Sequence, residues 1–415
     1  MARHVLRRCR STAGIFRTVA PVIAWTSQAV GGGIGAATPG GMDVKTELVE
    51  LSNIPASRTP VLSTFLETRW VDEHQRGRAR AVVESGLRSA AAAHPPPLPE
   101  DLHWVEARTA AIIGQAELVG SRGVALFACS PVGLRRVLAL RAPVATAVIL
   151  GSRPNLRPLV EALPGVDEML VVSLDREQAR LISIGPAGMR DEVALAADVP
   201  GHHRRGGWAQ LAQSRYQRHI EVHRDRHLHA VAEAARGLVH DLAVERVVVM
   251  GDAEIVGALR GGLDPDVASR VVATLPGSRY EPSADLVDRA LVAAEQSRAT
   301  ETAARVESVL VEAEKQGRAT AGLSSTLDAV SRGGVHQLYL LRAFRQLGRE
   351  CERCGLLKAE GVPTCPLCGG VTIETELGEA AVRRVLSAKG TVIDIPQHAG
   401  LARHGGLAAS VRYAV

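Results

Sequence analysis

The sequence has 415 residues, enough for about two to four domains. Hydrophobic residues make up 46% of it and charged residues 22%, an ordinary globular composition, and no stretch approaches the ~20 uninterrupted apolar residues of a membrane-spanning helix. The net charge of +5 is too small to identify a nucleic-acid-binding protein, so the local distribution of charge matters more.

Residues 1–42 are predicted to be a disordered extension. They contain Arg3, Arg7, Arg8, Arg10 and Arg17, and no acidic residue occurs before Asp43. A targeting segment is an alternative, but Arg17 interrupts its candidate apolar core. An upstream start codon, with Met42 as the true start, is another alternative. The glycine-rich run 31–41 is expected to be a flexible joint.

Residues 43–164 are predicted to form an N-terminal α/β domain. Short apolar runs indicate buried strands, and stretches rich in Arg, Glu and Ala indicate helices. Strands are expected at 61–67, 123–128 and 144–150, and helices at 73–93 and 106–118. The consecutive prolines at 95–97 require a loop between the two helices.

Residues 165–282 form the predicted middle domain. Strands at 168–174 and 179–184 are joined by a polar turn, and a segment rich in Gly, His and Arg leads to a long helix at about 208–241. A strand at 244–250, a short helix at 253–260 and a strand at 271–275 follow. This alternation predicts a mainly parallel sheet with helical cover.

Residues 283–415 form the predicted C-terminal domain. It begins with a long helix at about 284–316, and a helix at 323–332 and a strand at 335–343 follow. A cysteine-rich segment, 351–370, then interrupts the pattern, which ends with a helix at 379–389 and strands at 390–395 and 407–413. The chain is therefore predicted to consist of three α/β domains.

Four of the six cysteines fall in one short stretch. Cys351 and Cys354 are followed, after ten residues, by Cys365 and Cys368, which is the spacing of a zinc ribbon. Four thiolates suit a tetrahedral, structural Zn²⁺ site in a reducing compartment. Such a site is closed and leaves no open coordination position, so no catalytic role is assigned to it. The alternatives are a metal-free pair of redox dithiols and an iron–sulfur site.

A glycine pair in the middle domain lies among basic residues. The segment 200–210 reads Pro-Gly-His-His-Arg-Arg-Gly-Gly-Trp-Ala-Gln, and two glycines let a backbone approach another molecule closely. Arginine side chains suit a polyanion because their planar forks match phosphates. The residues predicted to contact RNA are His202, His203, Arg204, Arg205, Trp208, Arg215 and Arg218. Histidines 202, 203, 219, 223 and 227 add hydrogen-bonding capacity. A solvated basic helix after a simple turn is the alternative.

The stretch 171–251 resembles the middle domain of the class-1 release factors of eukaryotes and archaea and of Pelota. The shared layout is two strands around an acidic turn, then Pro-Gly-basic-Gly-Gly, a helix rich in Ser, Arg and Gln, and an apolar strand ending in Gly. In release factors the glutamine of a Gly-Gly-Gln loop positions the water that cleaves peptidyl-tRNA. Here Trp208 and Ala209 separate Gly207 from Gln210, which is similar to the Gly-x-x-Gln loop of the tRNA hydrolase of eukaryotic ribosome quality control. The resemblance implies that Gly206, Gly207 and Gln210 are catalytic.

The flanking domains extend this resemblance. Residues 304–415 resemble the third domain of release factors, which implies a kink-turn-binding ribosomal-protein fold with an inserted zinc ribbon. The first domain has no Asn-Ile-Lys-Ser-like stop-codon reader and is similar to that of the bacterial branch of the family. Codon-specific termination is therefore not expected.

Two functions follow from the resemblance. We favour an enzyme that hydrolyses peptidyl-tRNA on stalled ribosomes without reading a codon, because Gln210 is retained. The alternative is a non-catalytic hibernation factor that occupies the A site, which the two-residue insertion favours. Either implies a cytoplasmic monomer without membrane contact, with rRNA of the A site and peptidyl-tRNA as partners and a translational GTPase as a further candidate. A third interpretation is an RNA-binding protein unrelated to translation.

Overall fold

The computed structural model describes residues 16–17, 44–70, 72–114, 122–140, 142–162, 168–185, 188–196, 209–278, 280–361 and 363–413. The chain forms two compact units: unit 1 comprises residues 1–24 and 167–298, and unit 2 comprises residues 25–166 and 299–415. Both are α/β, so the predicted fold class is confirmed. The domain boundaries drawn from the sequence stay predictions.

Unit 1 is built on a mixed six-stranded sheet in the order β1-β8-β7-β6-β9-β10. The strands are β1 (Phe16–Arg17), β6 (Met169–Leu174), β7 (Gln178–Gly185), β8 (Gly188–Ala196), β9 (Arg246–Gly251) and β10 (Val271–Leu275). Only the β6–β9 and β9–β10 pairs are parallel, so the prediction of a mainly parallel sheet is wrong. The reason is the Asp175 turn, whose carboxylate accepts N–H groups of Glu177 and Gln178 and folds β6 and β7 into an antiparallel hairpin.

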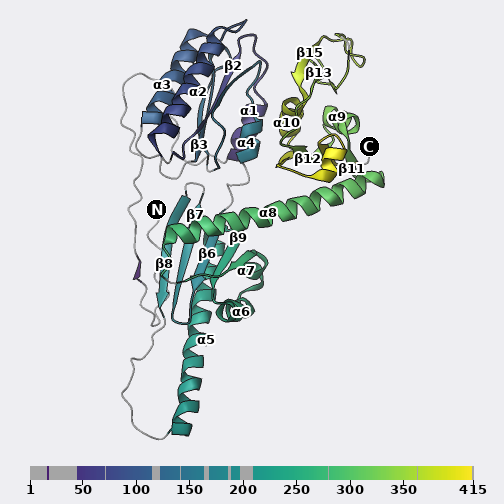
Figure 1. Ribbon diagram of the computed structural model, residues 1–415. Helices are drawn as coiled ribbons and strands as arrows, with labels where there is room; N and C mark the ends of the chain where they lie inside the picture. The colour runs from purple at the N-terminus through teal and green to yellow at the C-terminus, as the bar shows by residue number, and fades with distance from the viewer. Residues whose placement is uncertain are drawn as a thin grey trace. The chain divides into compact units, whose positions relative to one another are not determined.

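Helices cover both faces of this sheet (Figure 1). One face packs against α5 (Ala209–Asp241), α6 (Ala253–Gly262) and α7 (Pro265–Ser269), and the other against the beginning of α8 (Ser283–Glu314). Successive residues of β9 alternate between the two cores: Val247 and Val249 face α5, whereas Val248 and Met250 face α8. The apolar run in this strand is explained by burial on both sides.

The first sheet of unit 2 is antiparallel, in the order β4-β3-β2-β5. Its strands are β2 (Val61–Glu67), β3 (Gly123–Cys129), β4 (Leu134–Leu140) and β5 (Ala147–Gly151), and a 3-10 turn, Ser130–Val132, precedes β4. Helices α2 (Glu73–Ala91) and α3 (Pro99–Gly114) cover one face, and α1 (Val44–Ser52) and α4 (Arg157–Ala162) the other. Strand β4 and helices α1 and α4 were not predicted, and α3 begins earlier than the expected residue 106.

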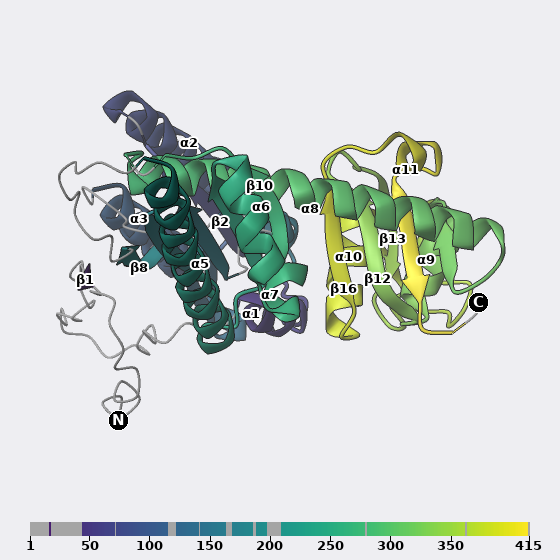
Figure 2. The ribbon, with the colours of Figure 1, turned by 90° about the horizontal axis from the view of Figure 1, so that it is seen from below.

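The second sheet of unit 2 has the order β11-β17-β12-β16. Its strands are β11 (Ala319–Ala321), β12 (Val335–Leu341), β16 (Thr391–Ile395) and β17 (Leu407–Val411). Helices α9 (Leu323–Ser331) and α10 (Leu377–Ser387) lie beside it in Figure 2 and pack on one face. The end of α8 and α11 (Ala399–Arg403) pack on the other. A small third sheet, β14-β13-β15, carries the cysteines and is formed by β13 (Leu347–Cys351), β14 (Leu357–Lys358) and β15 (Thr372–Glu376).

The two larger sheets of unit 2 share one continuous core, in which α4 lies close to α10. Arg157 of α4 is buried, and its guanidinium donates to the carbonyls of Phe344 at 2.6 Å and Arg342 at 2.8 Å. In return, the Glu379 carboxylate of α10 accepts the backbone N–H groups of Leu156 at 2.7 Å and Arg157 at 3.2 Å. We call these contacts the α4–α10 junction.

The α4–α10 junction contains a carboxyl group that titrates near neutral pH. Desolvation raises the pKa of Glu379 to about 7, although the hydrogen bonds from Leu156 and Arg157 act in the opposite direction.

No helix in the described parts of the chain is both long and apolar enough to cross a membrane.

Candidate functional site

The first cysteine pair lies in a tight turn that follows β13. The Cys351 N–H donates to the Leu356 carbonyl at 2.9 Å, and the Gly355 N–H donates to the Cys351 carbonyl at 2.8 Å. Gly355 has a φ of +70°, a conformation that glycine adopts without steric cost. The turn closes directly behind Cys354.

The second pair is built in the same way. The Gly369 N–H donates to the Cys365 carbonyl at 3.0 Å, and the Cys365 N–H donates to the Gly370 carbonyl at 2.7 Å. Gly369 has a φ of +72°, matching Gly355 in the first turn. The sequence placed a glycine after the second cysteine of each pair, and the structure shows why each is needed.

The two turns bring all four thiols together. Their sulfur atoms lie within 4.8 Å of one another, with Cys351 Sγ and Cys368 Sγ 3.5 Å apart and Cys354 Sγ and Cys365 Sγ 3.7 Å apart. Four sulfurs around a zinc ion, each at about 2.3 Å, would be about 3.8 Å apart. The separations greatly exceed the ~2.05 Å of a disulfide bond. The predicted grouping is confirmed, and the donor set fits a tetrahedral structural zinc site.

The thiols of this cluster titrate as a coupled set. Hydrogen bonds, first of all from the backbone N–H of Cys354, lower the pKa of Cys351 to about 6, whereas desolvation and the neighbouring thiols raise the pKa of Cys354 to about 12. Because the thiolate is the metal-binding form, metal binding to the set releases protons.

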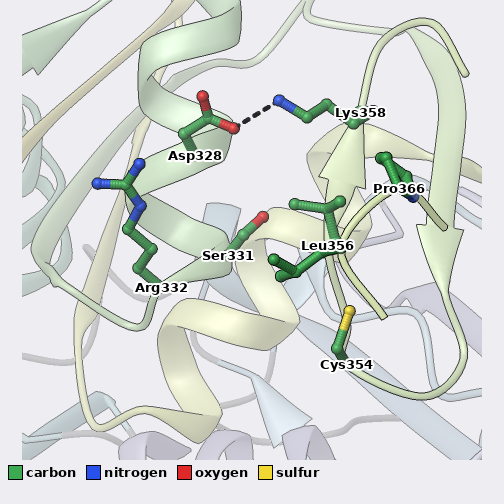
Figure 3. Close-up of a pocket in the computed structure, with 8 residues that line it drawn as sticks. Asp328, Ser331, Arg332, Cys354, Leu356, Lys358 and Pro366 are labelled. Atoms are coloured by element: carbon green, nitrogen blue, oxygen red, sulfur yellow. Dashed lines mark hydrogen bonds and ion pairs between the residues drawn. The ribbon is translucent and has the colours of Figure 1, made fainter. Parts of the chain in front are cut away.

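A pocket of about 340 Å³ lies beside the first turn (Figure 3). It is lined by Asp328, Ser331, Arg332, Cys354, Leu356, Lys358, Pro366 and Leu367. The Asp328 carboxylate binds the Lys358 ammonium at 2.8 Å, and the Ser331 hydroxyl donates to the Leu327 carbonyl and accepts the Leu357 N–H. These polar groups are engaged in holding the cysteine-bearing sheet to α9, so the pocket offers no activated nucleophile.

The other predicted site lies mainly outside the described residues. This is so for Gly206, Gly207, Trp208, His202, His203, Arg204 and Arg205. Gln210, Arg215 and Arg218 lie in the first turns of α5, where the backbone is helical and the side chains are not described. The assignment of these residues to catalysis and RNA binding stays a prediction.

The position of Gln210 along helix α5 is nevertheless defined by the backbone. The helix starts at Ala209, and its first buried side chains among those described are His227 and Leu228. At 1.5 Å per residue, the stretch from Ala209 to Arg226 is about 27 Å long. Figure 1 shows the corresponding part of α5 extending past the end of the unit 1 sheet. Gln210 therefore begins a long helical projection of unit 1.

Two basic residues further along α5 contact other parts of unit 1. His227 is only 4% exposed, and burial lowers its pKa, so the ring is neutral at pH 7 and does not belong to a solvent-facing basic surface. Arg224 pairs with Asp225 at 3.2 Å and lies 3.7 Å from Glu254 of α6. The expectation that His227 would add hydrogen-bonding capacity to this face is wrong, because α5 enters the core at that residue.

Sequence reasoning missed the residues around the first cysteine pair. Arg383 and Arg384, adjacent on α10, reach the turn that contains Cys351 and Cys354. Glu350, directly before Cys351, is buried and binds Arg383. The only sequence signal was an arginine pair in a helix that follows the cysteines, and this pattern alone does not identify a contact.

Comparison with protein families gives a match for one region. Residues 154–295 match the family described as "Bacterial archaeo-eukaryotic release factor family 10". The matched region includes segment 202–210 and the whole of α5. No curated protein matches the sequence.

Solved structures include similar chains of translation factors. An archaeal translation termination factor, aRF1, is 18% identical, with 89% of this chain and 98% of that chain covered and a TM-score of 0.26. Archaeal Pelota, from a model of ribosome-bound Pelota and ABCE1, is 15% identical, with 89% and 94% covered and a TM-score of 0.39. Dom34 of S. cerevisiae, described as a translation termination-like factor that interacts with Hbs1, is 10% identical, with 69% and 75% covered and a TM-score of 0.38. These TM-scores are below 0.5, and the family match is confined to residues 154–295.

Proposed function

Because residues 154–295 match the family of bacterial archaeo-eukaryotic release factors, we propose that this protein hydrolyses peptidyl-tRNA on stalled ribosomes without reading a codon. The single observation that carries the proposal is that the family match includes the Gly-x-x-Gln segment and the helix that begins beside it. A long helical projection suits a group that must reach the acyl end of tRNA within a larger RNA assembly.

The chemistry requires little from the protein itself. The ester between the peptide and the tRNA ribose is cleaved by water, and the tetrahedral intermediate needs polar groups near its oxyanion. In this proposal the amide of Gln210 orients the water, and Gly206 and Gly207 let the backbone approach the ester. Arg204, Arg205, Arg215 and Arg218 bind phosphates, and His202, His203 and Trp208 contact rRNA or tRNA.

The cysteine cluster has a structural part in this proposal. Cys351, Cys354, Cys365 and Cys368 would bind one Zn²⁺, with all four positions occupied by protein sulfur. The ion would stabilise the third sheet of unit 2, and a closed site leaves no position for substrate.

The proposed partners are rRNA of the A site and peptidyl-tRNA, which places the protein in the cytoplasm. A translational GTPase is a further candidate partner. Ribosome binding is expected to weaken as salt rises, because phosphate contacts release counterions.

The test is a peptide-release assay on stalled ribosome–nascent-chain complexes with Gln210→Ala. We expect release to slow by about 100- to 1,000-fold, the usual cost of removing one oriented polar group from such a site. Gln213→Ala, one helical turn further along α5, is the matched control and is expected to release peptide normally. Unchanged release by Gln210→Ala would refute the catalytic assignment.

A non-catalytic A-site factor is the second candidate, favoured by the insertion of Trp208 and Ala209 before Gln210. It predicts that the wild-type protein cosediments with vacant ribosomes and releases no peptide. The same assay therefore separates the two functions, because only the hydrolase gives release that depends on Gln210.

A further inference from the structure

Helix α10 touches the first cysteine pair through two consecutive arginines. Arg383 donates to both carboxylate oxygens of Glu350, at 2.7 and 2.5 Å, and both side chains are less than 10% exposed. Glu350 directly precedes Cys351 in β13. A buried ion pair, in which Nη2 of Arg383 contacts both oxygens, thus fixes the strand that contains the first cysteine.

Arg384 reaches the other end of the same turn. Its guanidinium donates to the Ser331 carbonyl of α9 at 2.9 Å. A Cβ atom built on Gly355 would lie 1.7 Å from Arg384 Nη1, so the guanidinium rests directly against the backbone that follows Cys354. Within the described part of the chain, the buried Nε of Arg384 has no hydrogen-bond partner. The hydrogen bonds of the Arg384 guanidinium therefore do not use all of its N–H groups, and this cation interacts electrostatically with Cys354.

The second cysteine pair has a different environment. The contacts that shape it come from the cysteine-bearing segment itself, such as the Thr372 N–H donating to the Pro363 carbonyl at 2.8 Å and Arg353 donating to the Cys368 carbonyl at 3.4 Å. Leu367, inside this pair, is 73% exposed. Helix α10 thus supports one half of the cluster, and Arg384 is its charged contact with the turn that follows Cys354.

We propose that Arg384 is a positioning residue for the four-cysteine centre, holding the first pair in place and offsetting the negative charge of the metal-bound thiolates. The inference rests on the proposed zinc site. Four thiolates and one Zn²⁺ carry a net charge of −2, which a partly buried guanidinium beside the site stabilises. The coupling is reciprocal, so zinc also stabilises the packing of α10 against α9 and the turn.

The test is chelator competition, which gives the zinc dissociation constant of the full-length protein. Arg384→Gln keeps a donor for the Ser331 carbonyl but removes the charge, and we expect zinc binding about 10- to 100-fold weaker. Arg384→Lys keeps the charge, and its affinity is expected to fall between those of Arg384→Gln and wild type. Arg403→Met is the matched control, since Arg403 is an exposed arginine of α11, outside the cysteine-bearing sheet. It is expected to bind zinc as wild type does.

The outcomes separate the two proposals. If the wild-type protein binds no zinc, the proposed metal site is wrong. If it binds zinc and Arg384→Gln binds it with equal affinity, the metal site stands and the role of Arg384 is refuted. Should Arg384→Gln not fold, Arg384→Lys decides, because an affinity equal to that of Arg403→Met refutes the role and a clearly weaker one supports it.

Discussion

The cysteine cluster of unit 2 and the beginning of α5 in unit 1 are both predicted functional regions, but they differ in how the surrounding residues pack. The cluster is enclosed by backbone hydrogen bonds of its own turns and by contacts with α9 and α10. The described residues of α5 before His227 are exposed or half-buried, and core packing begins at His227 and Leu228.

This difference shows where each region finds its partner. The thiols meet one another inside the protein, so a small ion completes their site. The beginning of α5 is a projection of unit 1, so the proposed partner is another macromolecule. Substitutions in the cluster should therefore change stability, whereas Gln210→Ala should change peptide release and leave thermal melting unaltered.

The largest expected effect is that of Cys354→Ser on the cluster. Structural zinc in small ribbons is bound with an apparent free energy of about 10–16 kcal/mol, and loss of one thiolate removes most of it. We expect the purified variant to lack zinc and to lose amide-exchange protection in β13, β14 and β15, with α5 unchanged. Metal analysis and hydrogen-exchange mass spectrometry measure these outcomes.

Cys9→Ser is the control for this experiment, because Cys9 lies far from the cluster in sequence and should leave the zinc content unchanged. Full zinc content in Cys354→Ser would show that this thiol is not a ligand. Loss of protection in α5 would show that the two regions are not independent.

A smaller effect is expected at the α4–α10 junction with Arg157→Met. The substitution removes the hydrogen bonds from a buried guanidinium to the carbonyls of Arg342 and Phe344, at a cost of about 1.5–3 kcal/mol, although Arg345 still donates to both carbonyls. We expect faster amide exchange in α4 and in the residues after β12, without loss of zinc. Arg78→Met, at an exposed position of α2, is the control. Unchanged exchange around Arg157 would mean that the guanidinium does not hold the junction.

The smallest expected effect is a change in pH dependence with Glu379→Gln. The pKa of Glu379 is about 7 in the folded protein against an ordinary value of 4.5, so the native state binds the proton more tightly than the unfolded chain does. This group's contribution to stability is therefore greatest below pH 4.5 and is lost as the pH rises through 7. Urea unfolding of wild type at pH 5.5 and 8, followed by tryptophan fluorescence, should show this loss.

Glu379→Gln should reduce the difference in unfolding free energy between the two pH values, because glutamine does not titrate. Glu374→Gln, at an exposed position of β15, should keep the wild-type difference. An equal pH dependence in Glu379→Gln and wild type would contradict the raised pKa.

Much of the local structure follows from sequence pattern. The long helix α5 ends at the predicted residue, and β2 has the predicted bounds, because periodicity and apolar runs are properties of the chain itself. The grouping of the four cysteines was also predictable, since each pair and its glycine form a local turn. The missed strand β4 contains the half-buried Arg135 and the exposed Arg136, and its burial does not alternate regularly, so no clear sequence pattern marks it.

The sequence by itself thus determined the α/β class, the cysteine cluster and the family resemblance of the middle region, because each depends on residues close together in the chain. Only the tertiary structure decided that β6, β7 and β8 are antiparallel, that His227 is buried, and that Arg157 and Arg384 reach groups on other elements. Those outcomes depend on which distant segments pack together, since burial and pairing, rather than residue type, decide whether a charged side chain faces solvent or supports a fold.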